Sequence, residues 1–223
     1  MLYIVPTPIG NLGDITIRAL EILKSVAVIA CEDTRTSSKL LGHYGIDTPR
    51  ISYHDHNEKE RTRQLIQRLE QGEDVALISD AGMPLISDPG YRLLQAVIDQ
   101  EIEYTVLPGA SSAITALVGS GLAIDKFHFD GFLPQKKGRQ TRIRAMAERR
   151  ETTVAFESPH RIVKTLHKLS EYAGDDRRVV VAREISKKFE EYLRGTIRDV
   201  LETLESRPRV KGEIVLVVEG QDQ

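Results

Sequence analysis

Short apolar runs alternate along the chain with longer segments in which apolar residues recur at helical spacing. In the first half, the short runs occupy residues 2–5, 26–30, 51–54, 75–79 and 104–107. The periodic segments that follow them occupy residues 16–25, 34–44, 57–71, 90–100 and 111–119. The short runs predict buried strands and the periodic segments predict helices, the first with Asp14 as its N-cap. Their alternation predicts a parallel sheet built from βαβ units.

A break in this pattern lies at residues 131–139, where Gly, Pro and positive charge fall together. This composition predicts a linker or a mobile loop. A second series follows, with helices at residues 141–150, 161–172 and 198–205 and strands at residues 153–156, 179–182, 191–195 and 214–218. We therefore expect an α/β protein with two α/β domains, residues 1–131 and 132–223.

The loops that follow the first five predicted strands are unusually polar. They cover residues 6–14, 32–35, 54–58, 79–90 and 108–112. Gly, Pro, Asp and Ser are ordinary turn formers, but several of these loops also carry charged side chains that a turn does not require. Because the carboxyl ends of parallel strands share one edge of a sheet, the loops predict a binding rim there.

Familiar phosphate-binding motifs do not fit the first loop. Gly10 and Gly13 follow a strand, but the first glycine of a G-x-G-x-x-G fingerprint would fall at Pro8 and no Lys follows Gly13. The start of the predicted helix at Ser111 and Ser112 suits either a bound carboxylate or simple capping. Asp80 ends a buried-looking strand, so its carboxylate is expected to need a partner.

Composition narrows the class of protein further. The chain has 223 residues, of which 40% are hydrophobic and 29% charged, with a formal net charge of −2. The single cysteine, Cys31, excludes an internal disulfide and fits the end of a buried strand in a cytoplasmic protein. No apolar run approaches the roughly 20 residues of a membrane span, and the first residues lack a basic region of the kind that begins a signal peptide. A net negative charge does not favour nucleic-acid binding by bulk electrostatics, although a local basic patch would suffice.

Ten segments distributed along the whole chain resemble the tetrapyrrole methylase superfamily. They lie at residues 2–16, 32–35, 54–58, 79–82, 84–90, 107–109, 131–134, 156–161, 182–184 and 211–213. The match is closest to those members that methylate the ribose 2′-hydroxyl of a cytidine in 16S ribosomal RNA. The resemblance implies two α/β domains with S-adenosylmethionine in the cleft between them, the first domain forming the substrate rim and part of the cofactor site. The implied cofactor-binding residues are Pro8, Ile9, Asp80, Met83, Ser111, Ser112, Phe156, Glu184, Gly212, Glu213 and Ile214.

The sequence departs from the family pattern in two places. Met83 replaces a threonine of an Ala-Gly-Thr-Pro loop, which alters the cofactor contact only if that side chain is used. The basic helical extension that usually follows in the family is expected to be absent, which bears on RNA affinity. The resemblance also implies a cytoplasmic homodimer that acts on 16S ribosomal RNA in the small subunit, with no membrane or DNA partner.

A ribose hydroxyl is a weak nucleophile and benefits from a general base. Among the rim candidates Glu32, Asp33, His54, Asp55 and His56, we expect Asp33 or His54 to orient or deprotonate the hydroxyl, with Arg35 near a phosphate. The alternative is that residues 32–35 form a helix cap with an internal ion pair. His54 and His56 with Glu58 make only a weak metal signal, and no bound metal is expected.

Positive charge near the domain junction is the expected RNA contact. The candidates are Lys136, Lys137 and Arg139, with Arg161 from the family segment at residues 156–161. The alternative is a solvated helix face. Two other functions remain open from sequence: methylation of a small tetrapyrrole, which lacks support from the segments at residues 54–58 and 156–161, and a cofactor-binding regulatory module without catalysis.

Overall fold

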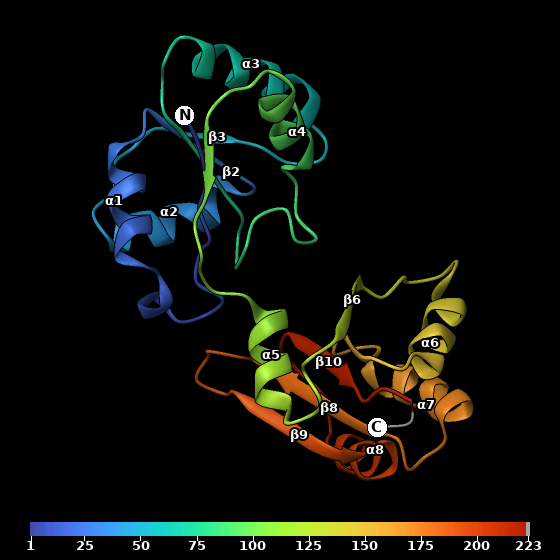
Figure 1. Ribbon diagram of the computed structural model, residues 1–223. Coiled ribbons are helices and arrows are strands. Elements are labelled where there is room, and N and C mark those ends of the chain that lie inside the picture. The colour runs from blue at the N-terminus through green and yellow to red at the C-terminus, as the bar shows by residue number, and fades with distance from the viewer. Residues whose placement is uncertain (222–223) are drawn as a thin grey trace. The chain divides into compact units, whose positions relative to one another are not determined.

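A computed structural model describes residues 1–221 and divides the chain into two compact units, Met1–Ser111 and Ser112–Gln223. The predicted second domain, residues 132–223, is thus described except for its last two residues. Within residues 1–221, no helix combines the length and the apolar character that crossing a membrane requires. Each unit contains one five-stranded sheet (Figure 1).

The first unit is built from βαβ repeats, as its sequence pattern predicts. Its elements are β1 (Leu2–Ile4), the short 3-10 helix η1 (Leu12–Asp14), α1 (Ile17–Ser25), β2 (Val28–Cys31), α2 (Thr34–His43), β3 (Arg50–Ser52), α3 (Glu58–Glu70), β4 (Val75–Ile78), α4 (Tyr91–Asp99) and β5 (Tyr104–Val106). The strands run in the order β3-β2-β4-β1-β5 and every pair is parallel. The prediction of a parallel sheet is therefore confirmed for this unit.

Helices cover both faces of the first sheet (Figure 1). Leu23 of α1 and Leu41 of α2 pack with Ile29 and Ile78 on one face. On the other face, the apolar sides of α3 and α4 pack against the alternate strand residues Leu2, Ile4, Val28, Ala30, Val75 and Leu77. Burial on both faces explains why the sequences of these strands are continuous apolar runs and do not alternate between apolar and polar residues.

The second unit has a different sheet. Its elements are α5 (Ser112–Ser120), β6 (Phe127–Phe132), α6 (Arg139–Glu148), β7 (Thr152–Glu157), α7 (Ile162–Ala173), β8 (Arg178–Arg183), β9 (Glu191–Thr196), α8 (Ile197–Glu205) and β10 (Ile214–Val218). The strand order is β6-β7-β10-β8-β9. Helices α6, α7 and α8 form the main core of the unit with one face of this sheet, while α5 packs on its strands outside that core.

The second sheet is mixed, unlike the parallel sheet of the first unit. Only β6 and β7 are parallel, whereas β10 pairs antiparallel with both β7 and β8, and β8 with β9. The residues between β8 and β9 are too few for a crossover helix, so the two strands must turn back on each other. The direction of β10 depends on pairing between distant residues, which local periodicity does not report.

The boundary between the units lies about twenty residues before the predicted junction, since α5 and β6 belong to the second unit. Strand β6 was missed because a bulge between Phe129 and Phe132 interrupts its pairing with β7, with Gly131 at a φ of 63°. The expected linker, residues 131–139, is also too long at both ends. Gly131 and Phe132 belong to β6, and Arg139 begins α6.

One helix cap also differs from its prediction. The side chain of Thr16, and not that of Asp14, caps α1 by accepting a hydrogen bond from the Ala19 N–H at 3.1 Å. Asp14 lies in η1, one turn before the helix. The predicted placement of Cys31 is confirmed, since it is the last residue of β2 and is buried.

Candidate functional site

The polar loops of the first unit form one continuous rim, because all five follow the carboxyl ends of parallel strands. The loops after β1 and β4 are joined by two backbone hydrogen bonds, Thr7 N–H to Gly82 O at 2.9 Å and Gly82 N–H to Thr7 O at 3.0 Å. The Thr7 hydroxyl also donates to the Ser79 carbonyl at 3.1 Å. The neighbouring positions of β1 and β4 in the sheet thus bring loops about seventy residues apart in sequence into contact.

Two glycines allow the close approach of these loops. A Cβ on Gly109, in the loop after β5, would lie 2.5 Å from the Cβ of Pro6 in the first loop. Gly82 has a φ of 85°, and a Cβ there would lie 3.3 Å from the Ile9 side chain. Backbone therefore forms much of this surface, and Pro8 is buried while Ile9 and Met83 are half-buried beside it.

The loop after β4 has a strained backbone. Leu85 and Ser87 are non-glycine residues with φ values of 71° and 67°. Such conformations cost free energy and persist where the surrounding structure enforces them, often at functional sites. Asp80 at the start of this loop is exposed rather than buried, and its Oδ1 accepts a hydrogen bond from the Asp33 N–H at 3.1 Å. The partner that its carboxylate needs is therefore supplied by the neighbouring loop.

Several carboxylates of the rim shift one another's pKa values. Burial raises the pKa of the Glu32 carboxyl above its ordinary value, and the charges of Asp88, Asp80 and Asp55 raise it further. Partial loss of solvent contact raises the pKa of the largely exposed Asp80, and burial raises that of Asp88; nearby carboxylates raise both further. Asp88 was not singled out from the sequence, because its closeness to Asp80 and Glu32 depends on the order of the strands. Perturbed carboxyls gathered on one rim are typical of binding sites for cations and of acid–base sites.

Asp33 and Arg35 form the internal ion pair that was the alternative interpretation of their segment. The Asp33 carboxylate caps α2 by accepting from the Arg35 N–H at 2.8 Å, and it binds the guanidinium at 3.1 and 2.8 Å. These donors lower the pKa of Asp33 to about 2. The Arg35 side chain is nevertheless 89% exposed.

His54 lies near the start of the loop after β3, with one ring nitrogen engaged. Its Nε2 lies 3.1 Å from Nδ2 of Asn57, whose amide also donates to the carbonyl of Ser52. Since that amide nitrogen is a donor, the contact assigns the lone pair to Nε2 and the proton to Nδ1. Nδ1 is buried and has no hydrogen-bond partner among the described residues.

The cofactor-binding candidates of the second unit share one edge of its sheet. Phe156 near the end of β7 and Ala182 near the end of β8 both pair with Val215 of β10. The Glu184 carboxylate, just beyond β8, accepts from the Glu213 N–H at 2.9 Å. Gly212 has a φ of 92°, which L side chains rarely adopt, and a Cβ there would also meet the Glu184 side chain, so the position favours glycine. Ser112 begins α5 in this unit, whereas Ser111 ends the first unit.

Two of the four predicted RNA-binding residues are engaged in a buried cluster, the Glu157 cluster, formed by Glu157, Arg139, Arg161 and Thr165. The fully buried Glu157 carboxylate binds the Arg139 guanidinium, the Arg161 Nε at 3.1 Å and the Thr165 hydroxyl at 2.6 Å. Arg139 also donates to the Pro134 carbonyl at 2.9 Å. The structure brings these arginines together as an anchor for the segment before α6, while Lys136 and Lys137 in that segment are exposed.

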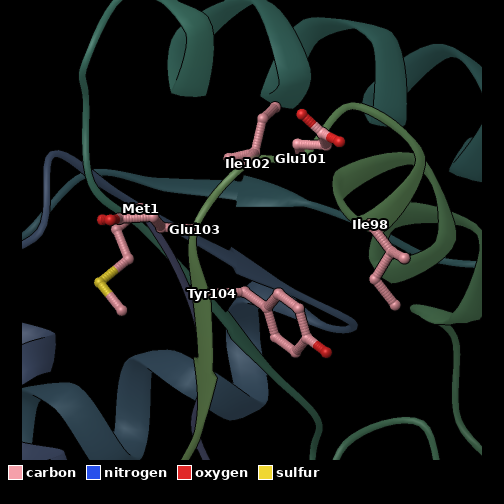
Figure 2. Close-up of a pocket in the computed structure, with 6 residues that line it drawn as sticks. All are labelled: Met1, Ile98, Glu101, Ile102, Glu103 and Tyr104. Atoms are coloured by element: carbon pink, nitrogen blue, oxygen red, sulfur yellow. The ribbon is translucent and has the colours of Figure 1, made fainter.

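A separate open cleft of about 500 Å³ lies at the amino ends of β1 and β5, away from the rim (Figure 2). Apolar Ile98, Ile102 and Tyr104 line it together with Glu101 and Glu103. It contains none of the predicted site residues.

Within residues 1–221, no group of three or more His, Cys, Asp or Glu side chains is arranged to hold a metal ion.

Comparison of the sequence with known families matches residues 1–201 to the tetrapyrrole (corrin/porphyrin) methylases. Among curated relatives, the "Ribosomal RNA small subunit methyltransferase I" of Haemophilus influenzae is 50% identical, and the match covers 99% of this chain and 79% of the relative. The proteins of the same name from Hydrogenobaculum and Bacillus subtilis are 48% and 46% identical, with matches that cover 99% and 100% of this chain and 96% and 76% of the relatives.

Solved structures with the same fold are more distant in sequence. A diphthine synthase superposes with a TM-score of 0.75 at 17% identity, covering 98% of this chain and 89% of the other. A cobalt precorrin-4 methyltransferase superposes with a TM-score of 0.71 at 18% identity, covering 97% and 93%. At these identities the similarity concerns the fold alone, and it confirms the predicted fold with two α/β domains.

Proposed function

The chain belongs to the tetrapyrrole methylases and, within them, to the group named ribosomal RNA small subunit methyltransferase I, and on this premise we propose that it methylates the ribose 2′-hydroxyl of a cytidine in 16S ribosomal RNA. Methyltransferases of this family use S-adenosylmethionine as the methyl donor. The proposal rests on sequence identities of 46–50% to relatives of that name over 99–100% of this chain. The polar rim of the first unit supports it. Acting on ribosomal RNA, the protein would work in the cytoplasm.

The rim suits S-adenosylmethionine by charge and shape. When bound, this cofactor supplies a methyl group already activated on a positively charged sulfonium, and its amino acid portion carries an ammonium. Glu32, Asp80 and Asp88 are carboxyls whose pKa values are raised by burial and by neighbouring negative charge. A cation beside them would relieve this repulsion. The backbone surface made by Gly82 and Gly109 permits the close approach of a flat nucleoside.

The cofactor-binding residues are proposed in two groups. In the first unit they are Pro8, Ile9, Asp80, Met83 and Ser111. In the second unit they are Ser112, Phe156, Glu184, Gly212, Glu213 and Ile214. Asp80 would accept hydrogen bonds from ribose hydroxyls or the ammonium, and Phe156 would offer an apolar ring face. Because the Glu184 carboxylate is already held by the Glu213 N–H and by Lys187, it would shape the second group rather than bind the cofactor as a free charge.

The geometry favours Glu32 over Asp33 as the group that accepts the hydroxyl proton. Asp33 is held in its ionised form by Arg35, with a pKa of about 2, so it is a weak base. In the tautomer assigned to His54, Nε2 is engaged by Asn57 and the buried Nδ1 carries the proton, so this ring has no free lone pair to take the hydroxyl proton. Partial burial, together with the charges of nearby carboxylates, raises the pKa of Glu32, and a base with a raised pKa is stronger.

RNA phosphates are proposed to bind Lys136 and Lys137, the two exposed lysines of the segment before α6. Arg139 and Arg161, first expected beside them, are proposed to act through the Glu157 cluster by anchoring that segment. Arg35, although paired with Asp33, is exposed enough to reach a phosphate next to the rim.

We also propose a homodimer, supported by exposed Ile98, Tyr104 and Val106 around the edge strand β5.

The proposal is tested by incubating the protein with labelled S-adenosylmethionine and small ribosomal subunits that lack the modification. Mass spectrometry of nuclease fragments should locate one 2′-O-methylcytidine in 16S ribosomal RNA. Uroporphyrinogen and precorrin acceptors serve as parallel substrates. Methylation of a tetrapyrrole instead of RNA, a methyl group on a base, or cofactor binding without any transfer would each contradict the proposal.

A further inference from the structure

Three phenylalanines cluster at the bulged end of β6 in the second unit. The rings of Phe129 and Phe132 flank that of Phe156, with centroid distances of 5.2 and 5.0 Å. Phe129 and Phe156 are half-buried, whereas Phe132 is 64% exposed. An exposed aromatic side chain that rests on other rings is a large apolar surface held in a defined orientation.

The backbone at Phe132 and directly after it is held by hydrogen bonds. Phe132 pairs with Phe156 across β6 and β7, and the next residue, Leu133, is buried and donates its N–H to the Phe156 carbonyl at 3.1 Å. The Pro134 carbonyl then accepts from Arg139 of the Glu157 cluster. Little conformational entropy therefore remains to be lost when a ligand covers the Phe132 ring.

Free positive charge follows Phe132 within a few residues of chain. Arg139 is engaged by Glu157, and Arg142 binds the buried Asp130 carboxylate at 2.8 Å. Lys136 and Lys137 are exposed and form no ion pair within residues 1–221. Four residues of chain span at most about 14 Å, so Lys136 lies within the length of a short stretch of single-stranded RNA from Phe132.

We infer that Phe132 stacks on a base of the substrate RNA while Lys136 and Lys137 bind the adjoining phosphates. This inference rests on the proposed function and adds a base-binding residue to it. An exposed ring next to unpaired cations is the combination by which proteins hold single-stranded nucleic acid: the ring takes the face of a base and the cations follow the backbone. The ring accepts any base, so it positions the strand rather than selecting the nucleotide.

Tryptophan fluorescence tests the inference directly, because the natural chain has no tryptophan. Phe132→Trp places a single indole at the proposed site. A single-stranded oligocytidylate of about ten nucleotides should quench its fluorescence. S-adenosylmethionine alone and an abasic oligomer of the same length and charge should not. Quenching by S-adenosylmethionine alone would assign the ring to the cofactor and overturn the inference, as would the absence of quenching by the RNA.

Phe189 provides a matched control. Its side chain is also 64% exposed, but it rests on no other aromatic ring among the described residues, and the Lys188 ammonium lies 5.7 Å from its centroid. Phe189→Trp should keep its fluorescence when the same oligocytidylate is added. Equal quenching of the two variants would mean that exposure alone explains the signal, which would overturn the inference.

Affinity measurements separate stacking from charge. Phe132→Leu should weaken oligocytidylate binding about 5- to 100-fold at every salt concentration, and Phe132→Tyr should restore most of the affinity. The double variant Lys136→Gln with Lys137→Gln should instead reduce the slope of log affinity against log salt by about 1.4. Calorimetric titration with S-adenosylmethionine should give the same Kd for all these variants. A changed salt slope in Phe132→Leu, or no loss of affinity, would contradict the stacking role.

Failure of this inference can be distinguished from failure of the proposed function. If the natural chain methylates 16S ribosomal RNA but Phe132→Trp is not quenched, only the stacking role is wrong. If the natural chain transfers no methyl group to the small subunit, the proposed function is wrong whatever the fluorescence shows.

Discussion

At the scale of single residues, the rim of the first unit separates neighbouring carboxyls into different chemical roles. Asp33 has three donors from Arg35, and these lower its pKa to about 2. Glu32, its neighbour in sequence, faces other carboxylates and has a raised pKa because of burial and their charge. Asp33, which caps α2, is therefore the stronger acid of the two. Glu32, directly after β2, is the stronger base.

We predict that Glu32→Gln lowers kcat at least about 100-fold at saturating cofactor and ribosomal subunits, because the proton acceptor is removed. Asp33→Asn should lower kcat less than about 10-fold. A base works in its ionised form, so the natural enzyme should lose activity as the pH falls through the raised pKa of Glu32. This acidic limb should be absent from the residual activity of Glu32→Gln.

Steady-state kinetics across a pH series would check this prediction, together with the Kd for S-adenosylmethionine of each variant. Glu32→Gln that binds the cofactor normally but keeps the natural turnover would contradict the role of Glu32. Equal losses in both variants would indicate that the segment acts through its structure and not through one base.

At the scale of elements, the Glu157 cluster joins three segments of the second unit. Glu157 ends β7, Arg139 begins α6, and Arg161 precedes α7. One fully buried carboxylate therefore holds two helix starts and, through the Pro134 carbonyl, the segment that carries Lys136 and Lys137. A basic patch in the sequence is thereby divided into anchored arginines and exposed lysines.

We predict that Glu157→Ala lowers the free energy of unfolding by about 3–5 kcal/mol, because two guanidinium groups lose their buried counter-charge. Glu148→Gln is the matched control, since its pair with Arg144 is exposed and should contribute less than about 1 kcal/mol. Urea unfolding followed by circular dichroism measures both. Similar stabilities for the two variants would show that the cluster contributes no more than a surface pair.

At the scale of the whole molecule, the edge of the first sheet is the surface that an assembly would use. Strand β5 has a partner only at β1 within the described sheet, and Tyr104 and Val106 on it are 43% and 48% exposed. Ile98 of α4 extends this apolar surface beside the cleft of Figure 2. An exposed apolar edge strand is open to pairing with another chain.

We predict that light scattering after size-exclusion chromatography gives about twice the chain mass of 25.0 kDa. The double variant Tyr104→Glu with Val106→Glu should elute as a monomer, because it buries two unpaired charges in the proposed interface. Phe189→Glu, which changes an exposed apolar residue elsewhere, should remain dimeric. A natural chain that is monomeric at every concentration tested would exclude the homodimer.

The sequence alone determined the elements of the first unit, the polar loops after its strands and the family. These features depend on residues close together along the chain: helical spacing, short apolar runs and compact motifs each carry their signal locally. The same locality explains the errors. The bulge in β6 disturbed its pattern, and nothing local to the run that forms β10 shows that it pairs antiparallel with β7 and β8.

Only the tertiary structure decided which charges act and which are held. Lys136 and Arg139 belong to one basic run, yet Arg139 is engaged by a carboxylate eighteen residues later, while Lys136 is exposed. Glu32 becomes a stronger base because its carboxyl is partly buried and because strand order places Asp88 and Asp80 near it. Charge interactions depend on distance and burial in three dimensions, so residues far apart in sequence determine them, and periodicity along the chain does not contain that information.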